Sequence, residues 1–112
     1  MKELSEKIRA FARDRDWEQF HSPKNLAMAL SVEVAEVVEY FQWLTQEESR
    51  RLDPARLEEI RQEIGDVMIY LVRLADQLGI DPLEAADEKI QINEKKYPVE
   101  KSRGLAAKYT EL

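Results

Sequence analysis

The sequence contains no cysteine and only one histidine, His21, among its 112 residues. The absence of cysteine excludes disulfides and thiolate-bound metals, and it is compatible with a reducing compartment. A single histidine also excludes a ferritin-like di-iron centre, because such a centre uses Glu-x-x-His pairs on its helices. Only three glycines and four prolines are present, and we therefore expect a helix-rich globular chain.

Long hydrophobic runs are also missing. No apolar stretch approaches the roughly 20 residues that a membrane span needs, and the N-terminal stretch MKELSEKIRAF has no apolar signal-peptide core. We expect a cytoplasmic protein with no membrane partner. The net charge of −6 argues against nucleic acid as a partner, since general nucleic-acid binders are more often basic. A metal-bridged nucleotide remains compatible with this charge.

The residues that are present predict an all-α chain forming one domain over residues 1–112. Ser22-Pro23, Asp53-Pro54 and Asp81-Pro82 each combine an N-cap residue with proline at the first helical position. Thr45 with Glu48 has the spacing of a capping box, and Gly79 is suited to end a helix. The predicted helices cover about residues 2–17, 23–44, 54–78 and 82–96, with a short turn at 45–48 and a polar tail at about 99–112.

Two of these helices carry heptad-like apolar seams, which predict a four-helix-bundle-like fold. The seam of the 54–78 helix contains Leu57, Ile60, Ile64, Val67, Leu71, Leu74 and Leu78. Further apolar residues, namely Val38, Phe41 and Ile69, lie off the main seams. A lone bundle of this size would leave some of them exposed, so we expect the chain to oligomerise.

Acidic residues are paired at helical spacing on these two helices. Glu33 and Glu36 share one face of the 23–44 helix, and Glu63 and Asp66 share one face of the 54–78 helix. Glu33 interrupts an apolar seam, where a carboxylate is costly unless it is paired or bound to metal. If the helices pack antiparallel, the pairs face one another, and a divalent cation would relieve their repulsion. All-oxygen ligands favour Mg²⁺, or alternatively Mn²⁺.

A plainer interpretation stays open at this point. The chain has 23 acidic residues, so Glu-x-x-Glu pairs arise by chance, and a helical interaction module with solvated acids would look similar. Gly65 lies inside the second pair, and a glycine within a helix costs about 1 kcal/mol relative to alanine. Such a cost is better tolerated where another group must approach the backbone closely.

Longer motifs surround the acidic pairs and carry a family resemblance. They are RDWEQFH at residues 15–21, Asn25-Leu26, EVAEVVEYFQW at 33–43, EIGDVMIYL at 63–71 and NEKKYP at 93–98. With SRG at 102–104 and KYT at 108–110, they resemble the MazG-type pyrophosphohydrolases, and within them the dCTP pyrophosphatase branch. The resemblance covers most of the chain.

The resemblance implies an enzyme that hydrolyses a nucleoside triphosphate to the monophosphate and pyrophosphate by attack at the α-phosphorus. Glu33, Glu36, Glu63 and Asp66 would bind Mg²⁺, which screens the triphosphate and helps to activate water; which acid is the general base stays open. The implied substrate-binding residues are Trp17, His21, Asn25, Trp43, Tyr70, Lys89, Asn93 and Lys96.

The resemblance further implies a homo-oligomer, a tetramer or a dimer, that removes dCTP and 5-modified dCTP from the nucleotide pool. One position departs from the pattern: Ile8 stands where we expect a polar histidine, which argues against strict selectivity for cytosine. Relatives with the same acidic pairs act on dUTP or on phosphoribosyl-ATP, and both alternatives stay open, although the tryptophan-containing motifs argue against the latter.

Overall fold

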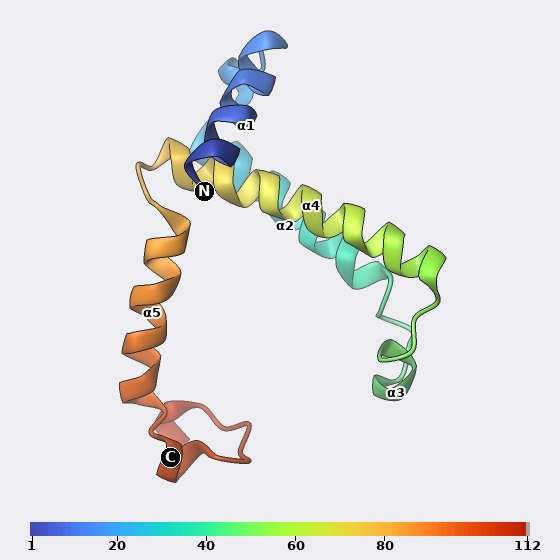
Figure 1. The fold of residues 1–112 in the computed structure, drawn as a ribbon, viewed down its shortest axis with the longest axis vertical. Helices are drawn as coiled ribbons and strands as arrows, with labels where there is room; N and C mark the ends of the chain where they lie inside the picture. The colour runs from blue at the N-terminus through green and yellow to red at the C-terminus, as the bar shows by residue number, and fades with distance from the viewer. Residues whose placement is uncertain (112) are drawn as a thin grey trace. The chain divides into compact units, whose positions relative to one another are not determined.

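The structure, a computed structural model, describes residues 1–111, and all of the regular secondary structure within them is helical (Figure 1). The prediction of an all-α chain is confirmed. The chain divides into two compact units, one covering Met1–Ile80 and one beginning at Asp81. The first unit contains α1 (Lys2–Asp14), the 3-10 turn η1 (Glu18–Phe20), α2 (Pro23–Glu39), α3 (Gln46–Ser49) and α4 (Pro54–Gln77). The prediction of a single domain stays a prediction.

The helix starts lie where the capping residues predict them. The side chains of Ser22, Asp53 and Asp81 each accept a backbone N–H from the first turn of α2, α4 and α5 (Pro82–Lys96), and each is followed by proline. Thr45 and Glu48 form the predicted capping box at the start of α3. These caps satisfy N–H groups that have no partner within the helix.

The first helix ends three residues earlier than predicted, at Asp14 rather than at about residue 17. Asp16 adopts a left-handed conformation with φ of 54°. Its N–H bonds to the Arg13 carbonyl at 3.0 Å, and the N–H of Trp17 bonds back to the Ala12 carbonyl at 2.9 Å. This is a Schellman ending built without glycine, because aspartate tolerates the left-handed region better than most residues.

The second helix also ends earlier than predicted, at Glu39 rather than at about Leu44. Beyond Glu39 the backbone bonds tighten to a three-residue spacing, from Tyr40 to Val37 and from Phe41 to Val38. The segment after Glu39 is rich in aromatic residues, which are weaker helix formers than those before it. The chain therefore leaves the helix without a glycine or proline to mark the point.

The first unit is organised around α4. α2 and α4 run antiparallel along one another, as predicted, and α1 also packs on α4 (Figure 1). The buried apolar side chains come from these three helices: Ile8, Ala12, Leu26, Ile60, Val72 and Ala75. The antiparallel pairing brings the two acidic pairs onto facing surfaces.

The predicted apolar seam of α4 is buried only in part. Ile60 is buried and Val67 and Leu74 are partly buried, whereas the alternate positions of the seam are exposed. The exposed positions form a stripe at seven-residue spacing: Leu57, Ile64, Leu71 and Leu78. One set of seam positions therefore packs within the chain, and the other set is exposed and can pack against another helix.

The second unit contains α5, α6 (Val99–Ser102) and the 3-10 turn η2 (Tyr109–Glu111). The aromatic rings of Tyr97 and Tyr109 meet edge to face at 6.1 Å. The predicted polar tail thus contains two short helical turns. The four-helix-bundle arrangement stays a prediction, because the helices that pack on one another in the first unit are α1, α2 and α4.

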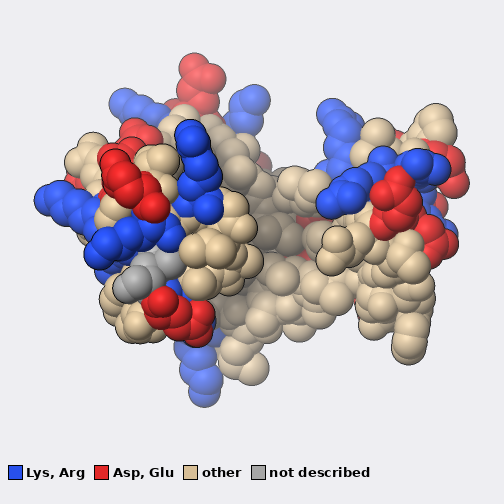
Figure 2. Space-filling model, turned by 90° about the horizontal axis from the view of Figure 1, so that it is seen from below, with Lys and Arg blue, Asp and Glu red and all other residues tan. Residues whose placement is uncertain are grey.

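No helix within residues 1–111 combines the length and apolarity needed to cross a membrane. Around α3, at the right of Figure 2, basic and acidic side chains are interspersed. Glu47 lies 3.8 Å from Arg50 and 2.7 Å from Arg51 in this region. These exposed pairs contribute little to stability.

Candidate functional site

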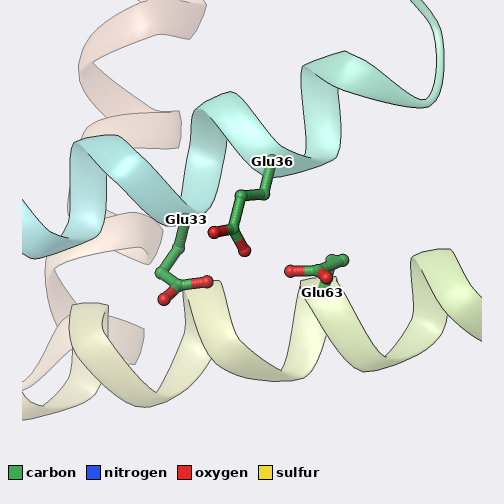
Figure 3. A group of neighbouring side chains, drawn as sticks. All are labelled: Glu33, Glu36 and Glu63. Carbon is green, nitrogen blue, oxygen red and sulfur yellow. The ribbon is translucent and has the colours of Figure 1, made fainter.

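Three of the predicted acidic residues converge between α2 and α4. One carboxylate oxygen from each of Glu33, Glu36 and Glu63 lies within 4.8 Å of the other two. Figure 3 shows the three side chains turned toward one another, with Glu33 and Glu36 on one helix and Glu63 on the facing helix. The spacing of three residues puts Glu33 and Glu36 on one face of α2, and the antiparallel neighbour supplies Glu63.

The electrostatics of this cluster disfavour three negative charges. Burial is the main cause that raises the pKa of Glu33, followed by its contact with Glu36 and the nearby charges of Asp66 and Glu63. The pKa of Glu63 is raised first by its hydrogen-bonding contact with Glu36, then by burial and by the charges of Glu36, Asp66 and Glu39. Converging carboxylates therefore repel one another unless a proton or a cation intervenes.

Two oxygens of the cluster have no partner. Oε2 of Glu33 and Oε2 of Glu63 are both buried and make no hydrogen bond with the described part of the chain. A buried polar atom without a partner is costly, and a bound cation would supply the missing interaction. The donor set consists of hard carboxylate oxygens, which fits Mg²⁺ or Mn²⁺ in ligand type.

Asp66, the fourth predicted ligand, lies beside the cluster and outside the group of three. Its charge raises the pKa of both Glu33 and Glu63, so it lies within electrostatic range of them. Its side chain also lines a pocket of about 200 Å³. Asp66 is therefore near the acidic cluster and also forms part of the wall of this pocket.

Four of the predicted substrate-binding residues lie together. A pocket of about 410 Å³ is lined by Trp17, His21, Asn25 and Tyr70, among others. Trp17, His21 and Tyr70 also line the pocket that contains Asp66. The structure thus places an aromatic-walled hollow next to the acidic cluster.

The ending of α1 positions the aromatic wall. The Schellman bonds turn the chain so that the Trp17 ring meets Phe11 edge to face at 5.6 Å and His21 at 6.5 Å. Asn25 stabilises the connector from the other side, because its side-chain amide donates to the Phe20 carbonyl at 3.0 Å. The connector is therefore fixed at both ends.

Of the remaining predicted substrate-binding residues, one belongs to the first unit but does not line this pocket, and three belong to the second unit. Trp43 lies in the turn after α2 and is 87% exposed. Lys89, Asn93 and Lys96 lie on α5 in the second unit, and the ammonium group of Lys96 stands 4.8 Å from the centre of the Tyr109 ring. Their roles stay predictions.

Two arginines near the site were not predicted from the sequence. Arg73 is 4% exposed and lines the pocket with Asp66. Arg56 lines a hollow of about 530 Å³ with Glu36 and Glu63. A signal existed for Arg73, since a charged residue interrupts the apolar run at residues 71–75 and is followed by Asp76 at helical spacing.

The fold and the site define an all-α protein whose antiparallel helices form a carboxylate cluster suited to a divalent cation. The sequence model of the MazG-like family matches residues 28–112. The chain belongs to this family, which confirms the resemblance seen in its motifs.

Named relatives agree with this assignment. The chain is 45% identical over 104 residues to dCTP pyrophosphatase 1 of Bos taurus and 44% identical to that of Homo sapiens, covering 91% of this chain in each case. It spans 62% of the bovine protein and 61% of the human protein. The crystal structure of a pyrophosphatase from Archaeoglobus fulgidus is similar, with a TM-score of 0.83, 44% identity, and coverage of 88% of this chain and 92% of that one.

Proposed function

We propose that this chain is a metal-dependent nucleoside triphosphate pyrophosphohydrolase with dCTP and 5-modified dCTP as its preferred substrates. The observation that carries the proposal is the convergence of Glu33, Glu36 and Glu63, with unpartnered buried oxygens, beside an aromatic pocket. The names of the mammalian relatives and of the archaeal neighbour support the reaction type.

The acidic residues would hold the cation. Glu33, Glu36 and Glu63 are the ligands for which the geometry is most favourable, and Asp66 is the fourth ligand that we predict. When bound, Mg²⁺ would neutralise triphosphate charge and polarise the phosphoryl oxygens. The helices contribute by fixing the carboxylates before the substrate arrives, which lowers the cost of assembling the site.

The proposed reaction joins water to the α-phosphorus. A bond forms between the water oxygen and this phosphorus, while the bond from it to the oxygen bridging to the β-phosphorus breaks. The bridging oxygen leaves with pyrophosphate, and the water proton passes to a carboxylate of the cluster or to solvent. Arg56, which shares a hollow with Glu36 and Glu63, offers a guanidinium suited to a phosphate oxygen.

The pocket beside the cluster would hold the nucleobase. Trp17 and Tyr70 provide aromatic faces for stacking, which is worth roughly 1–3 kcal/mol per base and tolerates any base. His21 and Asn25 add polar groups to the same walls. We propose that Trp43, Lys89, Asn93 and Lys96 complete base and phosphate binding, as the family resemblance implies.

A homo-oligomer, either a tetramer or a dimer, accompanies this proposal. The stripe of exposed apolar residues on α4 is of the kind that another helix covers. Apart from the backbone of its own helix and its chain neighbours, no described atom lies within 4 Å of the position that a β-carbon of Gly65 would take, so packing against other parts of the chain does not explain the glycine. Close approach of a helix from another copy would explain it.

The proposed role is removal of unwanted nucleotides from the cytoplasmic pool. Ile8 lines the pocket beside Asp66, where an apolar side chain offers no hydrogen bond to a base. We therefore expect preference for cytosine rather than strict selectivity. Activity on dUTP or on phosphoribosyl-ATP is the alternative within enzymes, and a helical interaction module is the alternative outside them.

Pyrophosphate release from a panel of nucleotides tests the proposal. The panel contains dCTP, 5-methyl-dCTP, dUTP, dTTP and phosphoribosyl-ATP, each with Mg²⁺ and with a chelator. We expect magnesium-dependent release of pyrophosphate and monophosphate, fastest with the cytosine nucleotides. Release fastest with dUTP or phosphoribosyl-ATP would replace the substrate assignment, and no release from any nucleotide would favour the interaction module.

A further inference from the structure

A buried arginine lies against the single histidine of the chain. The Nε–H of Arg73 donates to Nδ1 of His21 at 3.2 Å, and its Nη1 donates to Asp76 at 3.5 Å. Asp76 in turn accepts two bonds from Arg9, at 2.7 and 2.6 Å. This hydrogen-bonded series links α1, α4 and the connector before α2, and it fixes the guanidinium of Arg73 against the imidazole.

The bond from Arg73 determines where the proton of His21 lies. A guanidinium has only donors, so Nδ1 of His21 must present its lone pair. A neutral imidazole carries one N–H, which is then on Nε2. Burial first, and then the positive charge of Arg73, lower the pKa of His21, with Glu18 opposing them. Both effects favour the neutral ring.

The other ring nitrogen is available to the pocket. His21 lines both hollows that contain Trp17 and Tyr70. Within residues 1–111 no hydrogen bond engages Nε2, and this atom is not among the buried atoms that lack a partner. A ligand in the pocket can therefore reach the Nε2–H group.

We propose that Arg73 is a positioning residue that holds His21 as the Nε2–H tautomer, so that the pocket presents a fixed hydrogen-bond donor to a nucleobase. The matching ligand group is an acceptor on the edge of the base, either a carbonyl oxygen or an unprotonated ring nitrogen. The contact with a nucleobase rests on the proposed function. The tautomer of His21 does not, because it is a property of the free protein.

The tautomer is tested directly by nitrogen-15 NMR of the imidazole. Because His21 is the only histidine, a two-bond proton–nitrogen spectrum contains one imidazole. In the wild-type protein we expect an unprotonated Nδ1 and a protonated Nε2. The reverse pattern, or an equal mixture, would overturn the proposal even if no variant folds.

Variants at Arg73 test what holds the tautomer. Arg73→Met should produce a mixture of tautomers, and Arg73→Lys, which keeps a donor, should restore the Nε2–H form. Arg61→Met is the matched control, because Arg61 also lies on α4 and pairs with an acidic residue, Glu58, at 3.3 Å. An unchanged tautomer in a folded Arg73→Met protein would contradict the positioning role.

Titrations with two different ligands distinguish recognition of the base from recognition of the phosphates. The probes are the non-hydrolysable analogue α,β-imido-dCTP and inorganic tripolyphosphate, each with Mg²⁺. We expect the Nε2 signal to shift with the nucleotide analogue and to stay in place with tripolyphosphate. An equal shift with both would assign the donor to phosphate and overturn the base contact, as would no shift with the analogue.

Kinetics give a readout that a merely structural role would not change. Arg73→Met should raise KM for dCTP about tenfold, as expected for one lost hydrogen bond, and leave kcat within about twofold. A tenfold fall in kcat with an unchanged KM would contradict the proposal that Arg73 positions His21 for binding of the base. Failure of the proposed function appears separately, as absent turnover in the wild-type protein.

Discussion

Among individual residues, Trp43 has the most surprising environment. An indole that is 87% exposed buries little within its own chain, and its removal creates no cavity there. If Trp43 were a core residue, its truncation to alanine would lower the free energy of unfolding by several kcal/mol. The exposure of the side chain argues against a core role. The side chain is therefore available for a ligand or for another copy of the chain.

We predict that Trp43→Ala raises KM for every nucleotide together while the melting temperature changes little. Stacking tolerates any base, so dCTP and dTTP should be affected alike. Steady-state kinetics with both nucleotides and a thermal melt check this. A melting temperature that falls by many degrees alongside an unchanged KM would assign Trp43 to packing instead.

At the scale of helices, Asp76 connects α1 to α4. The hydrogen bond from Arg9 is the main cause that lowers the pKa of Asp76, burial opposes it, and the charges of Arg9 and Arg73 add to the lowering. A carboxylate whose folded-state pKa is lowered stabilises the fold above its unfolded pKa of about 3.9. This stabilisation is lost as the pH falls through the folded pKa.

Arg9→Met should therefore lower the melting temperature near neutral pH, and the gap to the wild-type protein should narrow below about pH 4. Melts across pH 2–7, a range chosen to span the ordinary carboxylate pKa, check the prediction. Arg13→Met is the control, since Arg13 lies 3.9 Å from Asp14 and both are exposed. A gap that does not vary with pH would show that charge at Asp76 is not its cause.

The helix starts could be predicted because their signals are local. A capping side chain followed by proline acts within a few residues, and Ser22, Asp53 and Asp81 all behave as expected. The ends of α1 and α2 were missed because neither has a glycine or proline. Asp16 adopts the left-handed conformation that ends α1, and an aspartate at that position does not by itself signal a helix end.

In the candidate site, too, some contacts could be predicted from the sequence and others could not. Glu33, Glu36 and Glu63 could be predicted to meet, because helical spacing and one antiparallel pairing suffice to bring them together. The bond between Arg73 and His21 joins residues 52 positions apart. Predicting it requires knowing which face of α4 receives the connector, and the sequence pattern does not contain this information.

For the whole molecule, the exposed apolar stripe of α4 departs from what a self-contained fold would show. Leu57 and Ile64 are both more than half exposed, although they belong to one heptad seam. We predict that light scattering finds an oligomer at micromolar concentration and that Ile64→Glu dissociates it, because a charge would then lie within an apolar contact. A stable, active wild-type monomer would contradict this.

We propose that the carboxylate cluster binds a divalent cation and that turnover depends on this cation. Magnesium-dependent hydrolysis of dCTP by Glu33→Gln and Glu63→Gln, with Mn²⁺ binding measured on the same samples, tests this dependence. Glu58→Gln is the control, because Glu58 lies on α4 but pairs with Arg61 outside the cluster.

Both cluster variants should lose cation binding and at least about a hundredfold in turnover, because mutating residues that only support metal ligands already costs up to about a hundredfold. Glu58→Gln should keep both properties. Without Mg²⁺, the cluster variants should melt at or above the wild-type temperature, since each removes a repulsive charge. Full dCTP turnover by folded Glu33→Gln or Glu63→Gln would show that turnover does not depend on a cation bound by this cluster.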